Sequence, residues 1–223
     1  MSDSATLEIN ENKTMVYRLV AGLLTFLSYV LYRPRVTGKE NIPLVGPVLI
    51  APIHRSNVDF AFTLFISSRK VFFMAKDGIF KFAPLRILLL HLGAFPVKRG
   101  SADRESMALA EEVLRRGHAL VLFPEGTRKE GRAVAELRDG AMFVAARTGA
   151  TVVPVGVGGS EKAMPSGKWL PRPARIRIVI GAPIAPPSTE GQGRVSRRAI
   201  TAKSEELRAE LERVYQEALD QLG

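Results

Sequence analysis

Residues 47–53 read PVLIAPI, a short apolar run with several β-branched side chains. Such a run is typical of a strand that is buried on both faces of a sheet. It is followed directly by the polar sequence His54-Arg-Ser-Asn-Val-Asp59. In open α/β sheets, ligands bind in the crevice beyond the carboxyl ends of the strands. This junction therefore indicates both a fold class and the place where a site is expected.

Short apolar runs alternate with helical patterns along the rest of the chain. Besides residues 47–53, the expected strands are 71–75, 94–97, 119–123, 151–157 and 175–181. Expected helices begin near Asn57, lie within 80–92, and cover 103–116, 138–148 and 196–221. This alternation predicts a single α/β domain with a mixed, largely parallel sheet covered by helices on both faces.

An uncharged segment precedes this core. Residues 19–31 read LVAGLLTFLSYVL, with Arg18 and Arg33 on either side and tyrosines near both ends. A helix of about 13 residues is about 20 Å long, whereas the hydrocarbon core of a bilayer is about 30 Å thick. We therefore expect a helix that lies in the membrane interface without crossing it, the alternative being an ordinary core helix. The expected division is residues 1–33 as tail and interface helix, and 34–223 as the main domain with its C-terminal helix.

The composition excludes several classes of protein. The chain has 223 residues, of which 46% are hydrophobic and 24% charged, so a disordered or multi-spanning protein does not fit. A net charge of +10 favours phosphate-rich partners such as nucleic acid, anionic lipid or a phosphorylated substrate.

The absence of cysteine excludes disulfides and cysteine acyl-enzymes. His54, His91 and His118 are too far apart for a local zinc motif, so we expect no metal. Residues 1–12 contain acidic residues and neither Lys nor Arg, so we expect no secretion signal.

His54 and Asp59 form the first candidate pair. Asn57 is a good N-cap residue, which would leave His54 just before a helix and Asp59 in its first turn. A carboxylate at that distance can hold an imidazole, which gives a general base with an orienting acid. The alternative is a core or capping histidine with an aspartate on the surface.

A second candidate motif, Phe123-Pro-Glu-Gly-Thr-Arg128, follows the expected strand 119–123. Gly126 permits a tight turn, and Thr127 and Arg128 supply a hydroxyl group and a planar guanidinium with five N–H donors. These groups favour a binding site for phosphate or carboxylate. The alternative is a polar turn in which Glu125 and Arg128 pair with each other.

Two further segments complete the pattern: GAFPVKR at residues 93–99 and VVPVG at 152–156. In this order the four segments, within about residues 34–185, resemble the glycerophospholipid acyltransferase family, which includes 1-acylglycerol-3-phosphate acyltransferase. HRSNVD is similar to the family's His-x4-Asp signature, and FPEGTR matches its phosphate-binding signature without change. Ile53 and Lys98 depart from the family's usual Asn and Asp, which leaves the identity of the acceptor open.

The resemblance implies that His54 takes the proton of an acceptor hydroxyl group while Asp59 orients the imidazole, with no protein nucleophile. The residues that it implies for binding phosphate and glycerol are Lys76, Arg99, Glu125, Gly126, Thr127 and Arg128. The residues that it implies for binding the acyl donor are Val153, Pro154 and Val155, and backbone N–H groups near Gly156 are a candidate oxyanion site.

The implied activity is transfer of a fatty acyl group from acyl-CoA or acyl carrier protein to 1-acylglycerol 3-phosphate, which gives phosphatidic acid in phospholipid biosynthesis. The expected partners are a lysophospholipid acceptor, an acyl thioester donor and the bilayer, and no cofactor is needed. The expected location is peripheral or monotopic, on the cytoplasmic face of the cell membrane. Alternatives are acylation of glycerol 3-phosphate or another lysolipid and, outside the enzymes, a basic lipid-binding module. Nucleic acid is disfavoured because aromatic residues make up only 7% of the chain and do not interleave with its basic cluster.

Overall fold

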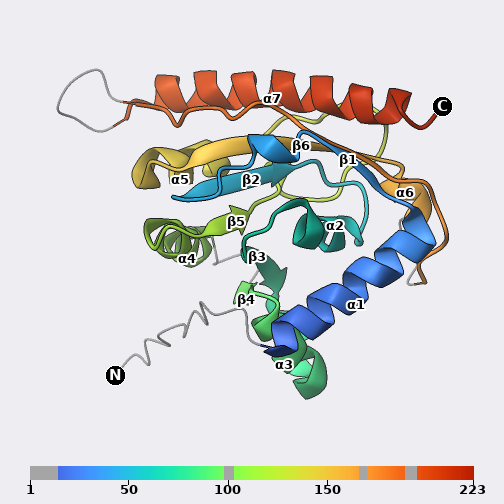
Figure 1. The fold of residues 1–223 in the computed structure, drawn as a ribbon. Helices are drawn as coiled ribbons and strands as arrows, with labels where there is room; N and C mark the ends of the chain where they lie inside the picture. The colour runs from blue at the N-terminus through green and yellow to red at the C-terminus, as the bar shows by residue number, and fades with distance from the viewer. Residues whose placement is uncertain (1–14, 98–102, 166–169, 189–194) are drawn as a thin grey trace.

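The computed structural model describes residues 15–97, 103–165, 170–188 and 195–223 (Figure 1). Within these residues, seven strands form one sheet in the order β1-β7-β6-β2-β5-β3-β4. All of its strand pairs are parallel except the antiparallel pair β6 and β7. The predicted mixed, largely parallel sheet is confirmed. The strands are β1 (Arg35–Thr37), β2 (Val48–Pro52), β3 (Val71–Lys76), β4 (Ala94–Val97), β5 (Ala119–Val121), β6 (Thr151–Gly158) and β7 (Arg177–Ile180).

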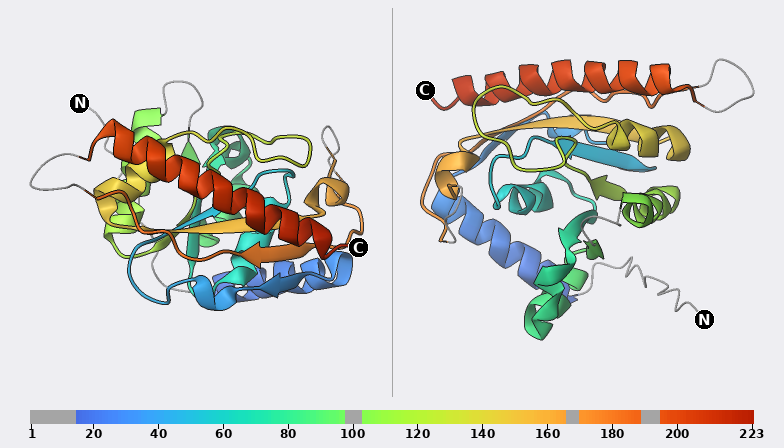
Figure 2. Two further views of the ribbon diagram at one scale, coloured as in Figure 1. Left: turned by 90° about the horizontal axis from the view of Figure 1, so that it is seen from above. Right: turned by 180° about the vertical axis from the view of Figure 1, so that it is seen from behind.

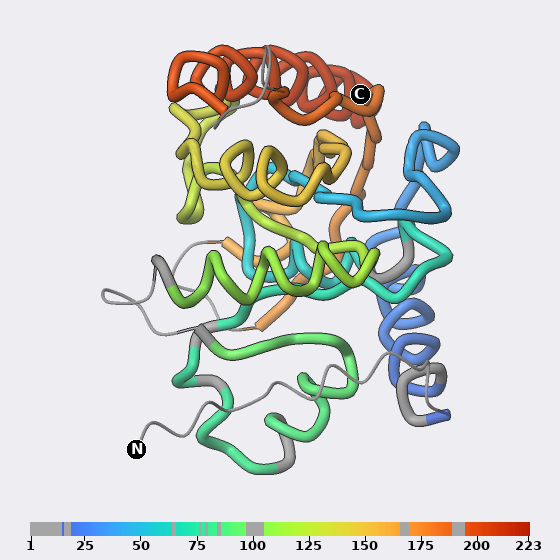
Figure 3. The backbone as a smooth tube through the Cα atoms, turned by 90° about the vertical axis from the view of Figure 1, so that its left-hand side faces the viewer, coloured from blue at the N-terminus to red at the C-terminus, as the bar shows by residue number. Residues whose placement is uncertain are grey.

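Helices cover both faces of the sheet, as the alternation predicted (Figures 1, 2 and 3). The helix α7 lies across one face beside α5, and α2 lies on the opposite face between the sheet and α1. The helices are α1 (Met15–Tyr32), α2 (Asp59–Ile66), α3 (Ala83–His91), α4 (Asp103–Arg115), α5 (Gly140–Thr148), α6 (Ser160–Ala163) and α7 (Arg197–Asp220). Short 3-10 helices are η1 (Lys39–Asn41) and η2 (Asp77–Lys81).

The predicted N-cap residue of the second helix is wrong, although the helix begins near Asn57, as expected, with Asp59 in its first turn. Asn57 makes no capping hydrogen bond, and α2 begins at Asp59 with Val58 at the N-cap position. The carboxylate of Asp59 instead accepts the backbone N–H groups of Arg55 and Ser56, both at 2.7 Å. Asp59 thus holds the turn that precedes the helix through its side chain.

Close packing of α7 on the sheet depends on two glycines of β6. A Cβ atom added to Gly156 would lie 2.4 Å from the backbone oxygen of Val214, and one added to Gly158 would lie 2.7 Å from that of Ala218. Any side chain at these positions would push α7 away from the strand. The position of α7 relative to the sheet is therefore fixed by backbone packing.

Helix α1 packs against the core on one side and is exposed on the other. Tyr32 is buried and meets the ring of Phe62 edge to face at 5.4 Å, so it cannot serve as an interface tyrosine. The opposite side of α1 exposes the large apolar side chains of Met15, Leu19, Leu23, Phe26, Leu27, Tyr29 and Val30. No helix in the described part of the chain is long and apolar enough to cross a membrane.

Candidate active site

The two candidate motifs meet because β2 and β5 are neighbouring parallel strands, with Ile50 opposite Val121. Their carboxyl ends point to the same edge of the sheet, so the segments that follow them lie side by side. The ring of Phe123 stacks on the imidazole of His54, with 4.1 Å between centroids. The backbone N–H of Lys129 also donates to the carbonyl oxygen of His54 at 2.9 Å. The loops that contain HRSNVD and FPEGTR therefore form one structural unit.

The expected contact between His54 and Asp59 is present. His54 Nδ1 lies 3.0 Å from Asp59 Oδ2, and the carboxylate is fully buried. Because an ionised carboxylate only accepts hydrogen bonds, it selects the tautomer with the proton on Nδ1 and leaves the lone pair on Nε2. The His54 side chain is 21% exposed, and Nε2 has no hydrogen-bond partner among the described residues. This arrangement can act as a general base with an orienting acid.

Glu125 lies inside the structure, not on the surface of the turn. Its Oε2 accepts the backbone N–H of His54 at 3.0 Å and Nη1 of Arg55 at 2.7 Å. Its Oε1 accepts the backbone N–H of Ala135 at 3.1 Å. The alternative of a Glu125–Arg128 pair is therefore wrong, since the partner of Glu125 is Arg55. With both oxygens engaged by the protein, Glu125 positions His54, and its implied contact with glycerol stays a prediction.

Arg55 is a residue that the sequence analysis did not single out. Its side chain is 1% exposed, and Nη1 also donates to the carbonyl oxygen of His54 at 3.1 Å. Burial alone would lower the pKa of the guanidinium, but the hydrogen bond and charge of Glu125 outweigh burial and raise it. Arg55 therefore stays charged within the core. Its position directly after His54 pointed to a place near the site. No spacing rule, however, links Arg55 to a glutamate that is 70 residues away in the sequence.

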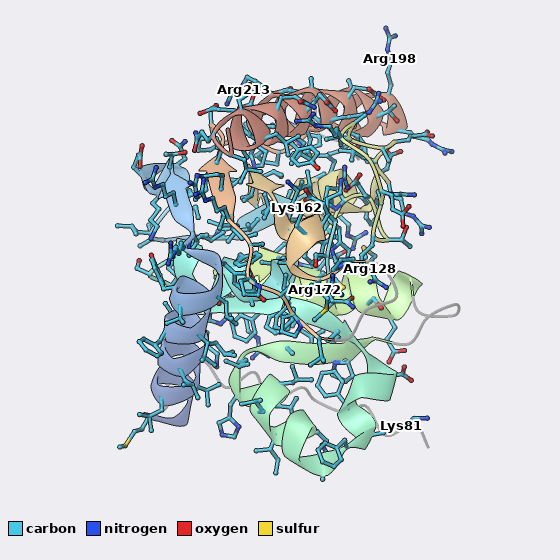
Figure 4. The ribbon with its side chains drawn as sticks, turned by 90° about the vertical axis from the view of Figure 1, so that its right-hand side faces the viewer. Lys81, Arg128, Lys162, Arg172, Arg198 and Arg213 are labelled. Atoms are coloured by element: carbon cyan, nitrogen blue, oxygen red, sulfur yellow. The ribbon has the colours of Figure 1, made fainter. Side chains whose placement is uncertain are left out.

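Gly126, Thr127 and Arg128 are exposed on this loop. Gly126 has a φ of +72°, and an added Cβ atom would meet the Arg138 side chain at 2.7 Å, so the tight turn requires glycine. Arg128 makes no hydrogen bond or ion pair within the described residues, and Figure 4 shows it on the same face as Lys162 and Arg172. Its guanidinium is available to an anion from solution.

The remaining candidate residues lie in two places. Lys76 is the last residue of β3, opposite Val97, and Arg99 lies outside the described residues. In the centre of the sheet, β6 pairs with β2 through residues that include Val153, Pro154 and Val155, all of which are buried. In this arrangement the three residues belong to the core, and a contact with an acyl donor would require neighbouring segments to move.

The candidate oxyanion site and a metal site both lack support from the geometry. Gly156 lies within the ladder of β6 and β7, opposite Val179, and beneath α7. This placement gives no opening for a substrate oxygen. Within the described ranges, no group of three His, Asp or Glu side chains could hold a metal ion. The expectation of a metal-free reaction stays a prediction.

Comparison with known proteins places this site in a family. The chain is 31% identical to the chloroplast 1-acyl-sn-glycerol-3-phosphate acyltransferase of Arabidopsis thaliana over 173 residues, which cover 75% of this chain and 48% of that protein. It is 28% identical to the 1-acyl-sn-glycerol-3-phosphate acyltransferase of Bacillus subtilis over 170 residues, or 76% of this chain and 82% of that protein. The chain thus spans about half the length of the plant relatives that it matches.

The fold has a solved counterpart. The crystal structure of the 1-acyl-sn-glycerophosphate acyltransferase PlsC from Thermotoga maritima matches with a TM-score of 0.72 and 25% identity. The match covers 90% of this chain and 78% of that chain. The model of the acyltransferase family matches residues 33–158, which include both motifs of the site. On this match and the geometry of its His54–Asp59 pair, the chain belongs to the acyltransferase family.

Proposed function

We propose that this protein transfers a fatty acyl group from an acyl thioester, acyl-CoA or acyl carrier protein, to the free hydroxyl group of 1-acylglycerol 3-phosphate. The product is phosphatidic acid. The observation that carries the proposal is the buried Asp59 carboxylate 3.0 Å from His54, on a loop bonded to the one that exposes Arg128. Relatives named as 1-acyl-sn-glycerol-3-phosphate acyltransferases support it.

The proposed reaction needs one base and no acyl-enzyme. Nε2 of His54 takes the proton of the acceptor hydroxyl group while the hydroxyl oxygen attacks the thioester carbonyl carbon. The new C–O bond forms, the C–S bond breaks, and the leaving thiolate takes the proton from the imidazolium. Asp59 stabilises the imidazolium, because its buried charge lies next to Nδ1. A thioester is already activated, so positioning and a base are sufficient.

Arg128 is the proposed phosphate ligand of the acceptor. A guanidinium offers two parallel N–H donors to a phosphate, which fixes orientation as well as charge. Arg128→Lys keeps the charge and loses this bidentate geometry. We expect kcat/KM for 1-acylglycerol 3-phosphate to fall about 10- to 100-fold, which corresponds to roughly 1.4 to 2.7 kcal/mol and to the strength of hydrogen bonds to charged groups.

The experiment compares 1-acylglycerol 3-phosphate with monoacylglycerol, which lacks the phosphate, in detergent micelles. The matched control is Arg172→Lys, because Arg172 is exposed on the same face and is tied to the protein only through its backbone N–H in the described residues (Figure 4). Arg128→Lys should lower the preference for the phosphorylated acceptor, and the control should not. An unchanged preference, or a loss confined to the donor, would contradict the assignment.

We also propose that α1 lies in a membrane interface, at the cytoplasmic face of the cell membrane. The support is its exposed apolar side together with the exposed cations Arg33, Arg35 and Arg175 near its C-terminal end. These cations are close together, since Ile176 N–H donates to Tyr32 O and β1 pairs with β7. Apolar side chains with flanking arginines suit an anionic bilayer surface. The division into a membrane segment, residues 1–33, and a catalytic domain, 34–223, belongs to this proposal.

Point substitutions test the membrane proposal better than deletion, because α1 also packs against α2. A variant with Leu19, Leu23 and Phe26 changed to Gln should sediment less with anionic vesicles while its unfolding midpoint stays unchanged. These side chains are 58% to 64% exposed, so their replacement removes little packing. Equal sedimentation of the variant and the wild-type protein would contradict an interface role for α1.

A further inference from the structure

The loop between β5 and α5 has no regular secondary structure from Leu122 to Arg138. It contains the FPEGTR motif, and its end comes back to its start where the N–H of Arg138 donates to the carbonyl oxygen of Pro124 at 2.9 Å. A loop of this length has few backbone hydrogen bonds of its own, so other parts of the chain must hold it. Figure 2 shows the loop rising from the sheet toward α7.

Side chains from outside this segment satisfy the backbone of five consecutive residues of the loop, 131–135. Two α7 residues make the shorter contacts: Glu212 Oε2 accepts the N–H of Val134 at 2.6 Å, and Gln216 Nε2 donates to the carbonyl oxygen of Arg132 at 2.9 Å. The remaining three contacts are Tyr215 OH to Gly131 O at 3.5 Å, Arg55 Nη2 to Ala133 O at 3.0 Å, and Ala135 N to Glu125 Oε1 at 3.1 Å.

The residues of α7 act as one group. Glu212, Tyr215 and Gln216 lie on one side of the helix, at the three- and four-residue spacings that bring side chains together. Gln216 Nε2 also donates to Glu212 Oε1 at 2.8 Å, which fixes the carboxylate that holds Val134. The Tyr215 ring lies 5.1 Å from the Arg55 guanidinium, so the same helix contacts the buried pair beneath His54. None of the three residues touches His54 or Arg128 directly.

Glycines of β6 fix the helix at this distance from the sheet, as described above. The family match ends at residue 158, so α7, at Arg197–Asp220, lies outside it. The stretch 126–133 between the buried Glu125 and the held Val134 is mostly exposed and includes Arg128. Among the described residues, two backbone hydrogen bonds restrain the start of this stretch: the N–H of Lys129 donates to the carbonyl oxygen of His54 at 2.9 Å, and that of Gly126 donates to the carbonyl oxygen of Phe123 at 3.0 Å.

We infer that Glu212 and Gln216 of α7 are positioning residues for Arg128: they hold the backbone of residues 131–135 and so keep the exposed stretch ordered for the acceptor's phosphate. This inference rests on the proposed function. Without the contacts, binding of the acceptor must order the loop, which weakens binding without changing the His54–Asp59 pair.

Kinetics of Glu212→Ala provide the first test. We expect KM for 1-acylglycerol 3-phosphate to rise about tenfold, the scale of ordering a few loop and side-chain groups. The kcat should stay within about twofold, and KM for the acyl donor and turnover of monoacylglycerol should not change. Glu212→Gln keeps a carbonyl oxygen for the Val134 N–H and should restore most of the acceptor binding.

The matched control is Glu217→Ala on the same helix. Glu217 pairs with Arg213 at 3.0 Å on the exposed side of α7, away from the loop. If both alanine variants raise KM equally, or if Glu212→Ala lowers turnover of phosphorylated and unphosphorylated acceptors alike, the inference is wrong, because α7 then acts only through general stability.

Hydrogen exchange of residues 126–136 separates this inference from the proposed function. If the backbone amides of this segment exchange faster in Glu212→Ala but not in Glu217→Ala, the result supports the inference that α7 orders the loop. That conclusion stands even if the wild-type protein proves inactive on 1-acylglycerol 3-phosphate. Unchanged exchange overturns the inference, even in a fully active enzyme.

Discussion

Replacing Glu125 with glutamine leaves the buried guanidinium of Arg55 without its carboxylate partner. In the wild-type protein the two side chains are 1% and 0% exposed and meet at 2.7 Å. Glutamine has the same size, but its amide group offers one acceptor oxygen where the carboxylate oxygens accept three hydrogen bonds, from His54, Arg55 and Ala135. At least one of these three donors must therefore lose its partner.

Breaking a buried ion pair by removing one partner costs about 3 to 5 kcal/mol, because the other charge stays buried and uncompensated. An exposed pair is worth only about 0 to 1 kcal/mol. The burial of this pair places Glu125→Gln in the first range. Arg55→Met alone should cost a similar amount, since it leaves a buried carboxylate. The double variant removes both charges and should cost at least about 2 kcal/mol less than the sum of the single variants.

The assay is urea unfolding followed by far-ultraviolet circular dichroism, with the free energy of unfolding extrapolated to water for all four proteins of the cycle. A matched cycle at the exposed pair Arg116 and Glu112, which meet at 2.8 Å, should give a coupling below about 1 kcal/mol. If Glu125→Gln costs no more than the exposed pair does, or if the two single effects add, the buried pair does not join the two loops.

Three further predictions concern other parts of the molecule. His54→Ala should lower kcat by at least about 100-fold in a protein that stays folded, and near-normal turnover would show that His54 is not the base. Gly126→Ala should lower the free energy of unfolding in urea by about 1 to 2 kcal/mol, because φ at this position is +72°. An unchanged free energy of unfolding would mean that the turn can accept a side chain. The hydrogen bond and charge of Arg213 lower the pKa of Glu210 from its ordinary value of 4.5. The pair therefore stabilises the fold above that value and loses its effect as the pH falls through the lowered pKa. Unfolding of Glu210→Gln should accordingly depend less on pH below about 4.5, and an unchanged pH dependence would contradict this origin.

Local sequence patterns predicted the parts of the fold that depend on nearby residues. The run at residues 47–53 contains β2, and the run at 119–123 contains β5, which ends at Val121, shortly before Pro124 and the turn at Gly126. His54 and Asp59 are five residues apart, so a single turn brings them into contact. The β1 strand was missed because its three residues, RVT, are too short to form an apolar pattern.

The parts that were not predicted depend on contacts between distant segments. Arg55 and Glu125 are 70 residues apart, and Glu212 is 78 residues from Val134. No periodicity or spacing in one sequence records such a pair, since either residue alone is compatible with an exposed position. The contact of Glu125 with glycerol, which the resemblance implies, stays a prediction, and the inward direction of its carboxylate, to the backbone of His54, was not visible in the sequence.

The most direct test of the central claim is mass spectrometry of the products that the purified protein forms from 1-acylglycerol 3-phosphate and a labelled acyl thioester. The proposed function predicts phosphatidic acid that contains the labelled acyl group, with one free thiol released for each molecule formed. Glycerol 3-phosphate and other lysolipids, offered in parallel, should give less product. Release of labelled fatty acid without phosphatidic acid, or no consumption of the thioester at all, would contradict the claim that this chain is a 1-acylglycerol-3-phosphate acyltransferase.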